Sequence, residues 1–129
     1  MGIAVLDASV LIAQTDASDA HHARARSVVL EAERRGELVA PATAFAEVMT
    51  GAYLAGPHEV ETLTRFFEAV VRVVPFSVEI AMTAARLRAQ GRLKLADAAV
   101  IATGIELDAD VILTADRRWK KFDPRVQVV

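Results

Sequence analysis

Cysteine is absent from this chain of 129 residues. Its absence excludes disulfide bonds, thiolate zinc sites and cysteine nucleophiles, and it fits the reducing conditions of the cytoplasm, where we expect the protein to reside. Oxygen ligands therefore remain as the means of holding a metal ion.

The chain also lacks a long apolar run, although hydrophobic residues make up 53% of it and the mean hydropathy is +0.31. Runs such as AVVRVVPF are interrupted by arginine or are too short to span a bilayer. The beginning, MGIAVLDASVL, has no basic segment and no cleavage site. We therefore expect neither a signal peptide nor a membrane contact.

Repeats, linkers and low-complexity segments are likewise missing, and the length predicts one domain over residues 1–129. A domain of this size buries about two-thirds of the surface that its unfolded chain exposes. The apolar content is high for so small a chain. This content predicts that a second copy covers part of the surface, as in a homodimer.

An excess of positive charge is missing too, because the net charge is −2 and the pI is near 5.9. The charge is unevenly distributed, however. Six acidic residues follow position 85, against nine basic ones, which are Arg86, Arg88, Arg92, Lys94, Arg117, Arg118, Lys120, Lys121 and Arg125. If a metal ion neutralises Asp97 and Asp116, the C-terminal third presents a basic rim around an acidic centre.

Short apolar runs alternate with helical patterns along the chain. They predict strands over residues 1–6, 38–40, 71–76, 110–115 and 126–129. They predict helices over residues 8–14, 20–35, 41–55, 58–70, 78–90 and 94–107. The alternation favours right-handed crossovers and a three-layer α/β/α fold with a mainly parallel central sheet of four to five strands.

Four carboxylates lie inside or at the end of uncharged apolar runs. Asp7 is the only charged side chain in residues 1–15, and Glu47 is the only one in residues 38–57. Asp97 opens the run ADAAVIATGI, and Asp116 closes VILTAD. A desolvated carboxylate costs several kcal/mol unless it is protonated, paired or bound to metal, so four isolated ones indicate a shared site.

The predicted elements allow these four side chains to converge. Asp7 and Asp116 follow predicted strands, and ligands of open parallel sheets bind beyond the carboxyl ends of the strands. Asp97 lies in the first turn of its helix, where the helix dipole favours an anion. Two unit charges about 5 Å apart repel by roughly 3 kcal/mol at an effective dielectric near 20. Such a group needs cations, which predicts one or two Mg²⁺ or Mn²⁺ ions.

Four segments, VLDASVLIA, FAEVM, LKLADAAVIATG and VILTAD, resemble in order the signature segments of PIN-domain ribonucleases, particularly the VapC-type toxins of toxin–antitoxin pairs. The resemblance spans nearly the whole chain. It implies a Mg²⁺- or Mn²⁺-dependent endoribonuclease that forms a homodimer and cleaves an RNA such as tRNA or rRNA. It also implies in-line attack by a metal-activated water and inhibition by a cognate antitoxin whose tail enters the active site.

The resemblance also assigns roles to individual residues. Catalysis and metal binding fall to Asp7, Glu47, Asp97 and Asp116. Ser9 and Thr114 match small hydroxyl positions that orient the first and last aspartate or a metal-bound water. Many relatives carry a further acidic residue shortly after the last aspartate, whereas arginine follows here. This departure implies a second metal that is bound weakly or only when substrate is present.

The basic residues that flank the acidic group are expected to contact RNA phosphates. They are Arg92, Lys94, Arg117 and Arg118. The alternative for the basic residues between positions 86 and 94 is an ordinary solvated helix face.

Simpler roles are open for three of the acidic residues as well. Asp7 fits an N-cap, Asp97 an early-helix residue that complements the dipole, and Asp116 the start of a turn. For the whole chain, the alternative function is a non-catalytic PIN-like module that binds RNA or a partner, which the missing downstream acid favours. A phosphoacceptor signalling domain is disfavoured, because VRVVPF ends in Pro-Phe where that site needs an acceptor aspartate.

Overall fold

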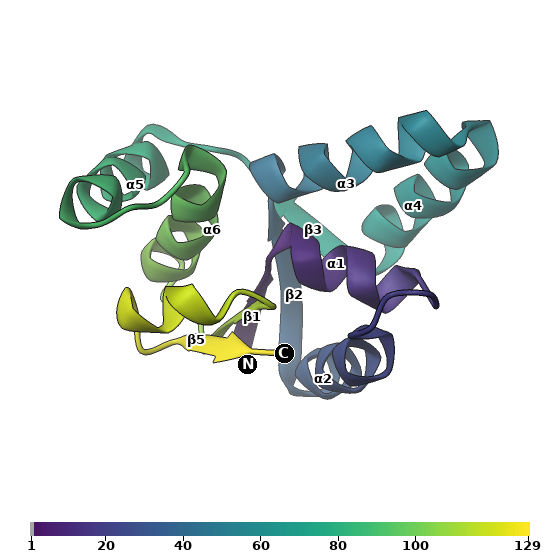
Figure 1. Ribbon diagram of the computed structural model, residues 1–129, viewed down its shortest axis with the longest axis horizontal. Helices are drawn as coiled ribbons and strands as arrows, with labels where there is room; N and C mark the ends of the chain where they lie inside the picture. The colour runs from purple at the N-terminus through teal and green to yellow at the C-terminus, as the bar shows by residue number, and fades with distance from the viewer. Residues whose placement is uncertain (1) are drawn as a thin grey trace.

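A computed structural model describes residues 2–129 and contains one five-stranded sheet between helical layers (Figure 1). Met1, which belongs to the first predicted strand, lies outside the described residues. The strands are β1 (Gly2–Leu6), β2 (Gly36–Pro41), β3 (Val71–Val74), β4 (Val111–Thr114) and β5 (Val126–Val128). The helices are α1 (Ala8–Thr15), α2 (His22–Arg35), α3 (Ala42–Ala55), α4 (Pro57–Val70), α5 (Val78–Gln90), α6 (Leu95–Glu106) and the short 3₁₀ helix η1 (Arg117–Lys121).

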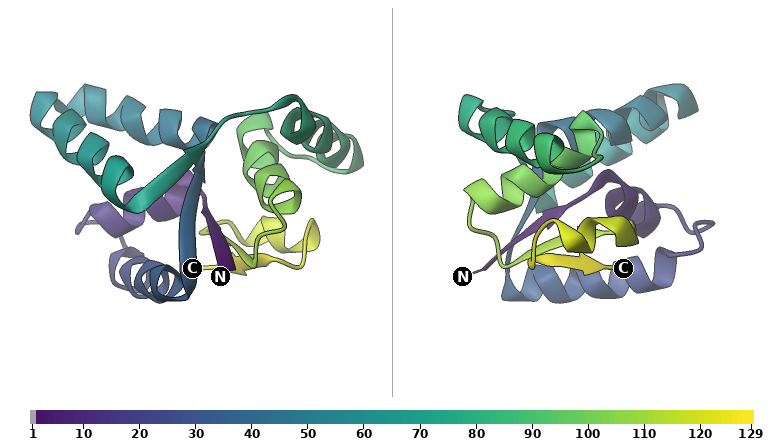
Figure 2. Two further views of the ribbon diagram at one scale, coloured as in Figure 1. Left: turned by 180° about the vertical axis from the view of Figure 1, so that it is seen from behind. Right: turned by 60° about the vertical axis from the view of Figure 1, so that its left-hand side comes forward.

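All strand pairs are parallel, in the order β3-β2-β1-β4-β5. Helices α1 and α2 lie on one side of the sheet and α5 and α6 on the other, as views from opposite directions show (Figures 1 and 2). Helices α3 and α4 pack on each other beside β2 and β3. The predicted three-layer α/β/α fold with a mainly parallel sheet is therefore confirmed.

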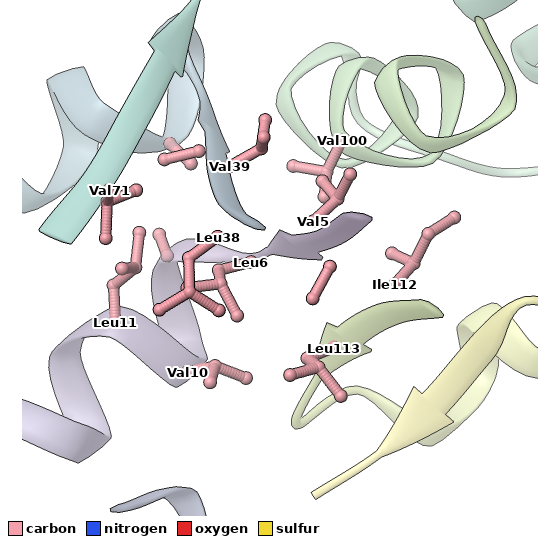
Figure 3. Close-up of a cluster of buried hydrophobic side chains, with 14 of the residues drawn as sticks. Val5, Leu6, Val10, Leu11, Leu38, Val39, Val71, Val100, Ile112 and Leu113 are labelled. Atoms are coloured by element: carbon pink, nitrogen blue, oxygen red, sulfur yellow. The ribbon is translucent and has the colours of Figure 1, made fainter. Parts of the chain in front are cut away.

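The core consists of two apolar layers, one on each face of the sheet (Figure 3). Neighbouring residues of a strand point to opposite faces, so Val5 lies on the α6 side and Leu6 on the α1 side. Both side chains are completely buried. The strands are buried on both faces, which explains why they appear in the sequence as continuous apolar runs rather than as alternating patterns.

Several element boundaries differ from the predicted ones. Strand β3 ends at Val74 rather than at residue 76, because Pro75 has no N–H to continue the ladder. Pro41 closes β2 and caps α3 with extended backbone, φ −61° and ψ 146°, instead of entering the first helical turn. Lys94 likewise precedes α6 as its N-cap residue. The helix predicted from residue 20 begins at His22.

The topology places two acidic residues beside each other. Strands β1 and β4 are neighbours, with Leu6 opposite Leu113. Asp7 directly follows β1, and Asp116 lies two residues beyond β4. Both therefore emerge at the carboxyl edge of the sheet, where ligands of open parallel sheets bind. Across residues 2–129, no helix is both long and apolar enough to cross a membrane.

Candidate active site

The four predicted acidic residues line one open cavity of about 490 Å³ at this edge of the sheet. They come from four parts of the chain: the end of β1, the middle of α3, the first turn of α6 and the segment after β4. The remaining lining residues are Ala8, Ser9, Ile12, Ala115 and Trp119. The structure thus brings together Asp7, Glu47, Asp97 and Asp116, with Ser9 beside them.

Asp7 is held by a hydrogen-bond network that joins β1 to β4. Its Oδ1 accepts from the Ala8 backbone N–H at 2.8 Å, and its Oδ2 accepts from the hydroxyls of Ser9 at 2.7 Å and Thr114 at 2.9 Å. The backbone N–H of Ala115 donates to the Ser9 hydroxyl at 3.1 Å. Asp7 is also the N-cap of α1, so the simpler role described above and a place in the acidic cavity coexist.

Burial dominates the electrostatics of Asp7 and raises its pKa, and repulsion by Asp97 adds to this effect. The hydrogen bonds from Ser9, Thr114 and Ala8 act in the opposite direction. The pKa nevertheless stays above its ordinary value. A cation beside Asp7 would therefore stabilise its charged form.

Glu47 and Asp97 also have raised pKa values, in each case chiefly through desolvation. Asp7 and Asp97 further raise the pKa of Glu47, and Asp116 raises that of Asp97. Lys94 partly offsets both shifts. Glu47 is nevertheless an exposed residue, and Asp7, Asp97 and Asp116 are half-buried, so none of the four carboxylates is completely removed from water. A helix surface at the cavity rim lets water reach this side chain despite its apolar sequence neighbours.

Asp116 differs from the other three, because Arg118 lowers its pKa. The guanidinium donates to both carboxylate oxygens, from Nε to Oδ1 at 3.0 Å and from Nη2 to Oδ2 at 2.6 Å. The backbone N–H of Arg118 also donates to Oδ1, at 2.9 Å, so Asp116 caps η1 and begins a turn as well. The sequence predicted an RNA contact for Arg118, and this ion pair with Asp116 was not predicted.

The donor set fits a hard divalent cation, since four carboxylates surround one cavity and three of them are destabilised in their charged form. The side chains are not yet arranged as ligands, however. Within residues 2–129, no three Asp, Glu or His side chains lie close enough together to hold an ion. Two of the four carboxylates already have protein donors on both oxygens: hydroxyl and backbone groups contact Asp7, and Arg118 contacts Asp116.

A basic groove of about 450 Å³ adjoins the acidic cavity and shares Asp97, Asp116 and Trp119 with it. Its basic lining residues are Arg88, Arg92, Lys94, Arg118 and Lys121. Three of the four predicted RNA-contacting residues thus lie in this groove. The fourth, Arg117, is exposed and is not among the residues that line it.

A larger cavity of about 830 Å³ lies at the opposite edge of the sheet, near the amino ends of β1, β2 and β4. Its charged groups already have structural partners. Asp110 accepts a hydrogen bond from the Ile3 backbone, Arg35 pairs with Glu31, and Arg125 bridges the carboxylates of residues 108 and 123. The charged side chains of this cavity are therefore occupied by protein partners. The smaller cavity, by contrast, contains three carboxyl groups whose pKa values are raised.

Comparison with known families gives an independent result. The sequence model of the family described as PIN domain matches residues 4–124. No curated protein sequence matches the chain.

Solved structures share the fold across most of their length. A toxin–antitoxin complex from Klebsiella pneumoniae contains a chain with a TM-score of 0.79 and 22% identity, over 97% of this chain and 96% of that one. VapBC-1 from nontypeable Haemophilus influenzae gives a TM-score of 0.76 and 18% identity, over 98% and 97%. Mycobacterium tuberculosis VapC20, described as a sarcin-ricin loop cleaving toxin, gives 0.69 and 18%, over 84% and 86%.

Proposed function

Because this chain belongs to the PIN domain family, we propose that it is a metal-dependent endoribonuclease, the toxin of a VapBC-like type II toxin–antitoxin pair. The observation that carries the proposal is the lining of one cavity by Asp7, Glu47, Asp97 and Asp116 at the carboxyl edge of the sheet. The toxin–antitoxin complexes that share the fold support the antitoxin partner, and the loop-cleaving VapC20 supports an RNA substrate.

The four carboxylates would hold one or two Mg²⁺ or Mn²⁺ ions. When bound, such an ion activates water and stabilises the leaving oxygen of a phosphodiester. Ser9 and Thr114 fix the orientation of the Asp7 carboxylate through their hydroxyl groups. Asp7, Glu47 and Asp97 are available to a cation only when deprotonated, so cation binding competes with protons at these groups.

The basic groove provides the complementary part of the site. Arg92 and Lys94 are exposed beside the acidic cavity and would bind phosphates of the strand being cut. Arg117 and Arg118 add positive charge at the start of η1. An acidic centre with a basic flank suits a polyanion whose reacting phosphate approaches bound cations.

Exposed apolar side chains support a homodimer and an antitoxin partner. Tyr53 and Leu54 on α3 are 72% and 85% exposed, and Val78 and Met82 on α5 are 76% and 70% exposed. Exposed apolar side chains that lie together on one helix are typical of protein contacts. We further propose one nuclease domain over residues 1–129 and a cytoplasmic location, on the basis of length and the absence of cysteine.

A non-catalytic PIN-like module that binds RNA or a partner is the second candidate. It is favoured by the arrangement of the carboxylates across residues 2–129, where no three converge on one point. Cleavage is the property that separates the two candidates.

The test is incubation of a generic single-stranded RNA with the purified chain in Mn²⁺, in Mg²⁺ and in excess EDTA. We expect cleavage with either metal and none in EDTA. Asp7→Asn, Glu47→Gln, Asp97→Asn and Asp116→Asn should each lower the rate at least about 100-fold, as for the loss of a group that organises the reaction. The matched control is Glu33→Gln, an equal change of charge on the exposed face of α2. Binding without cleavage under all conditions would favour the non-catalytic module.

A further inference from the structure

The guanidinium of Arg118 occupies the position beside Asp116 that a bound metal ion would take. Its guanidinium contacts both oxygens of Asp116, at 3.0 Å from Nε and 2.6 Å from Nη2. The Arg118 side chain is 81% exposed, whereas that of Asp116 is 24% exposed. The guanidinium thus lies on the solvent side of a carboxylate that faces the acidic cavity.

The contact is positioned to be reversible. Exposed ion pairs are weak, because water solvates the separated charges almost as well. The same two oxygens cannot hold the guanidinium in a fork and a divalent ion at full strength, since like charges would meet at one carboxylate. Metal binding at Asp116 therefore requires Arg118 to move away at least in part.

The basic groove gives the Arg118 guanidinium a place to bind a phosphate once it has left Asp116. Arg118 lines the basic groove together with Arg92, Lys94 and two further basic residues, and it is absent from the lining of the acidic cavity. It therefore stands at the boundary between the two. A phosphate in the groove would replace the carboxylate as its bidentate partner.

Trp119 lies beside the Asp116–Arg118 pair, and its backbone N–H donates to the Asp116 carbonyl at 3.3 Å. Its indole lines both the cavity and the groove and is 1% exposed, and its Nε1 has no hydrogen-bond partner in the part of the chain that the structure describes. A buried donor without a partner is costly. The indole is close enough to Asp116 to contribute to the lowering of its pKa.

We propose that Arg118 is an exchangeable cation of this site, which occupies Asp116 in the metal-free protein and transfers to an RNA phosphate when a divalent ion takes its place. This inference rests on the proposed function. It makes metal and RNA binding mutually reinforcing, because each ligand removes the competitor of the other, and the coupling must be equal in both directions.

The first experiment measures Mn²⁺ affinity by calorimetry on the full chain without RNA, so that it does not depend on activity. Arg118→Ala should bind Mn²⁺ about two- to fivefold more tightly than wild type, the scale of an exposed ion pair. Arg24→Ala is the matched control, because it removes the same charge from an exposed position on α2 that lines neither the acidic cavity nor the basic groove. Its affinity should change by less than about 1.5-fold, since solvent and salt screen a charge that makes no contact.

The same substitution in the Asp116→Asn variant tests whether Arg118 changes Mn²⁺ affinity through Asp116. In Asp116→Asn, further replacement Arg118→Ala should leave Mn²⁺ affinity unchanged, because the carboxylate over which the two cations compete is gone. Melting curves and circular dichroism confirm that each variant is folded. The exposed position of Arg118 makes a folding defect unexpected.

The third measurement tests the transfer to RNA. A cleavage-resistant phosphorothioate RNA should raise the Mn²⁺ affinity of wild type and of Arg24→Ala, and the increase should be smaller in Arg118→Ala. Equal Mn²⁺ affinities for all three proteins would overturn the inference, while metal-dependent cleavage by wild type would leave the proposed function intact. If neither wild type nor Arg118→Ala binds Mn²⁺ or cleaves RNA, the metal mechanism and the inference fail together.

Discussion

The Thr114 hydroxyl donates a hydrogen bond to Oδ2 of Asp7 over 2.9 Å, between residues 107 positions apart in the chain. The same hydroxyl accepts from the backbone N–H of Asp116 at 3.1 Å. Thr114 is completely buried at the end of β4, next to the end of β1. One side chain therefore fixes the relative position of the first and last acidic residues of the candidate site.

Two replacements of Thr114 should distinguish the role of its hydroxyl in orienting Asp7 from the role of its methyl group in packing. Thr114→Val keeps the shape but leaves the Asp116 N–H without its acceptor and Asp7 with one donor fewer, so we expect a loss of about 1–2 kcal/mol in urea unfolding. RNA cleavage should fall as well. Thr114→Ser loses a buried methyl group and some stability, yet it should retain most of the cleavage because the hydroxyl remains. Equal cleavage by the two variants would show that the hydroxyl does not orient the site.

The convergence of Asp7 and Asp116 was predictable from the sequence because both follow apolar runs short enough to be strands. In a parallel sheet such ends meet at one edge. The strand order was not predictable in the same way, since continuous apolar runs do not specify which strands are neighbours. The roles of Ser9 and Thr114 came only from the family resemblance, because a hydroxyl at a strand end has no periodic signal.

Two features of the site depend on tertiary geometry that sequence spacing does not contain. Glu47 lies in an apolar run yet is exposed, because its position on α3 faces the open cavity. Arg118 is two residues from Asp116, a spacing that does not face one side of a regular helix. The extended backbone of Asp116 at the start of η1 brings the two groups together.

Asp97 should be a source of instability in the metal-free protein. It has a raised pKa from desolvation and from repulsion by Asp116. A carboxyl group with a folded pKa above its unfolded value stabilises the fold at low pH, and this stabilisation is lost as the pH rises through the folded pKa. Asp97→Asn should therefore raise the melting temperature by roughly 1–3 °C at pH 7.5 in EDTA. The gain should shrink toward pH 4.

The control for this prediction is Glu33→Gln, which removes one negative charge from an exposed position on α2. It should shift the melting temperature little at either pH. With saturating Mn²⁺, wild type should have a higher melting temperature than Asp97→Asn, because metal binding then stabilises wild type more than the variant. A gain for Asp97→Asn that is independent of pH would show that its charge is not the cause.

RNA affinity should depend steeply on salt and on the basic groove. Reversal of charge at Arg92 and Lys94 together, to Glu, should weaken binding of a single-stranded RNA and reduce the slope of log K against log salt by about 1.4, or roughly 0.7 for each lost phosphate contact. Both residues are exposed, so the melting temperature should change little. Reversal at Arg24 and Arg26, exposed on α2, is the matched control. Equal binding by the two double variants would identify the groove as an ordinary solvated face.

An antitoxin tail that carries an arginine should compete with Mn²⁺ for the acidic cavity, because a guanidinium pairs with carboxylates in place of the metal. Asp116 already has such a partner in Arg118, whereas Asp97 has a raised pKa and no arginine bound in this way. Asp97→Asn should therefore weaken the complex more than Asp116→Asn does, and apolar contacts elsewhere should preserve some binding. Titration calorimetry with the cognate antitoxin, with and without Mn²⁺, measures both effects. Affinity that is independent of the metal and of both substitutions would show that inhibition acts away from the acidic cavity.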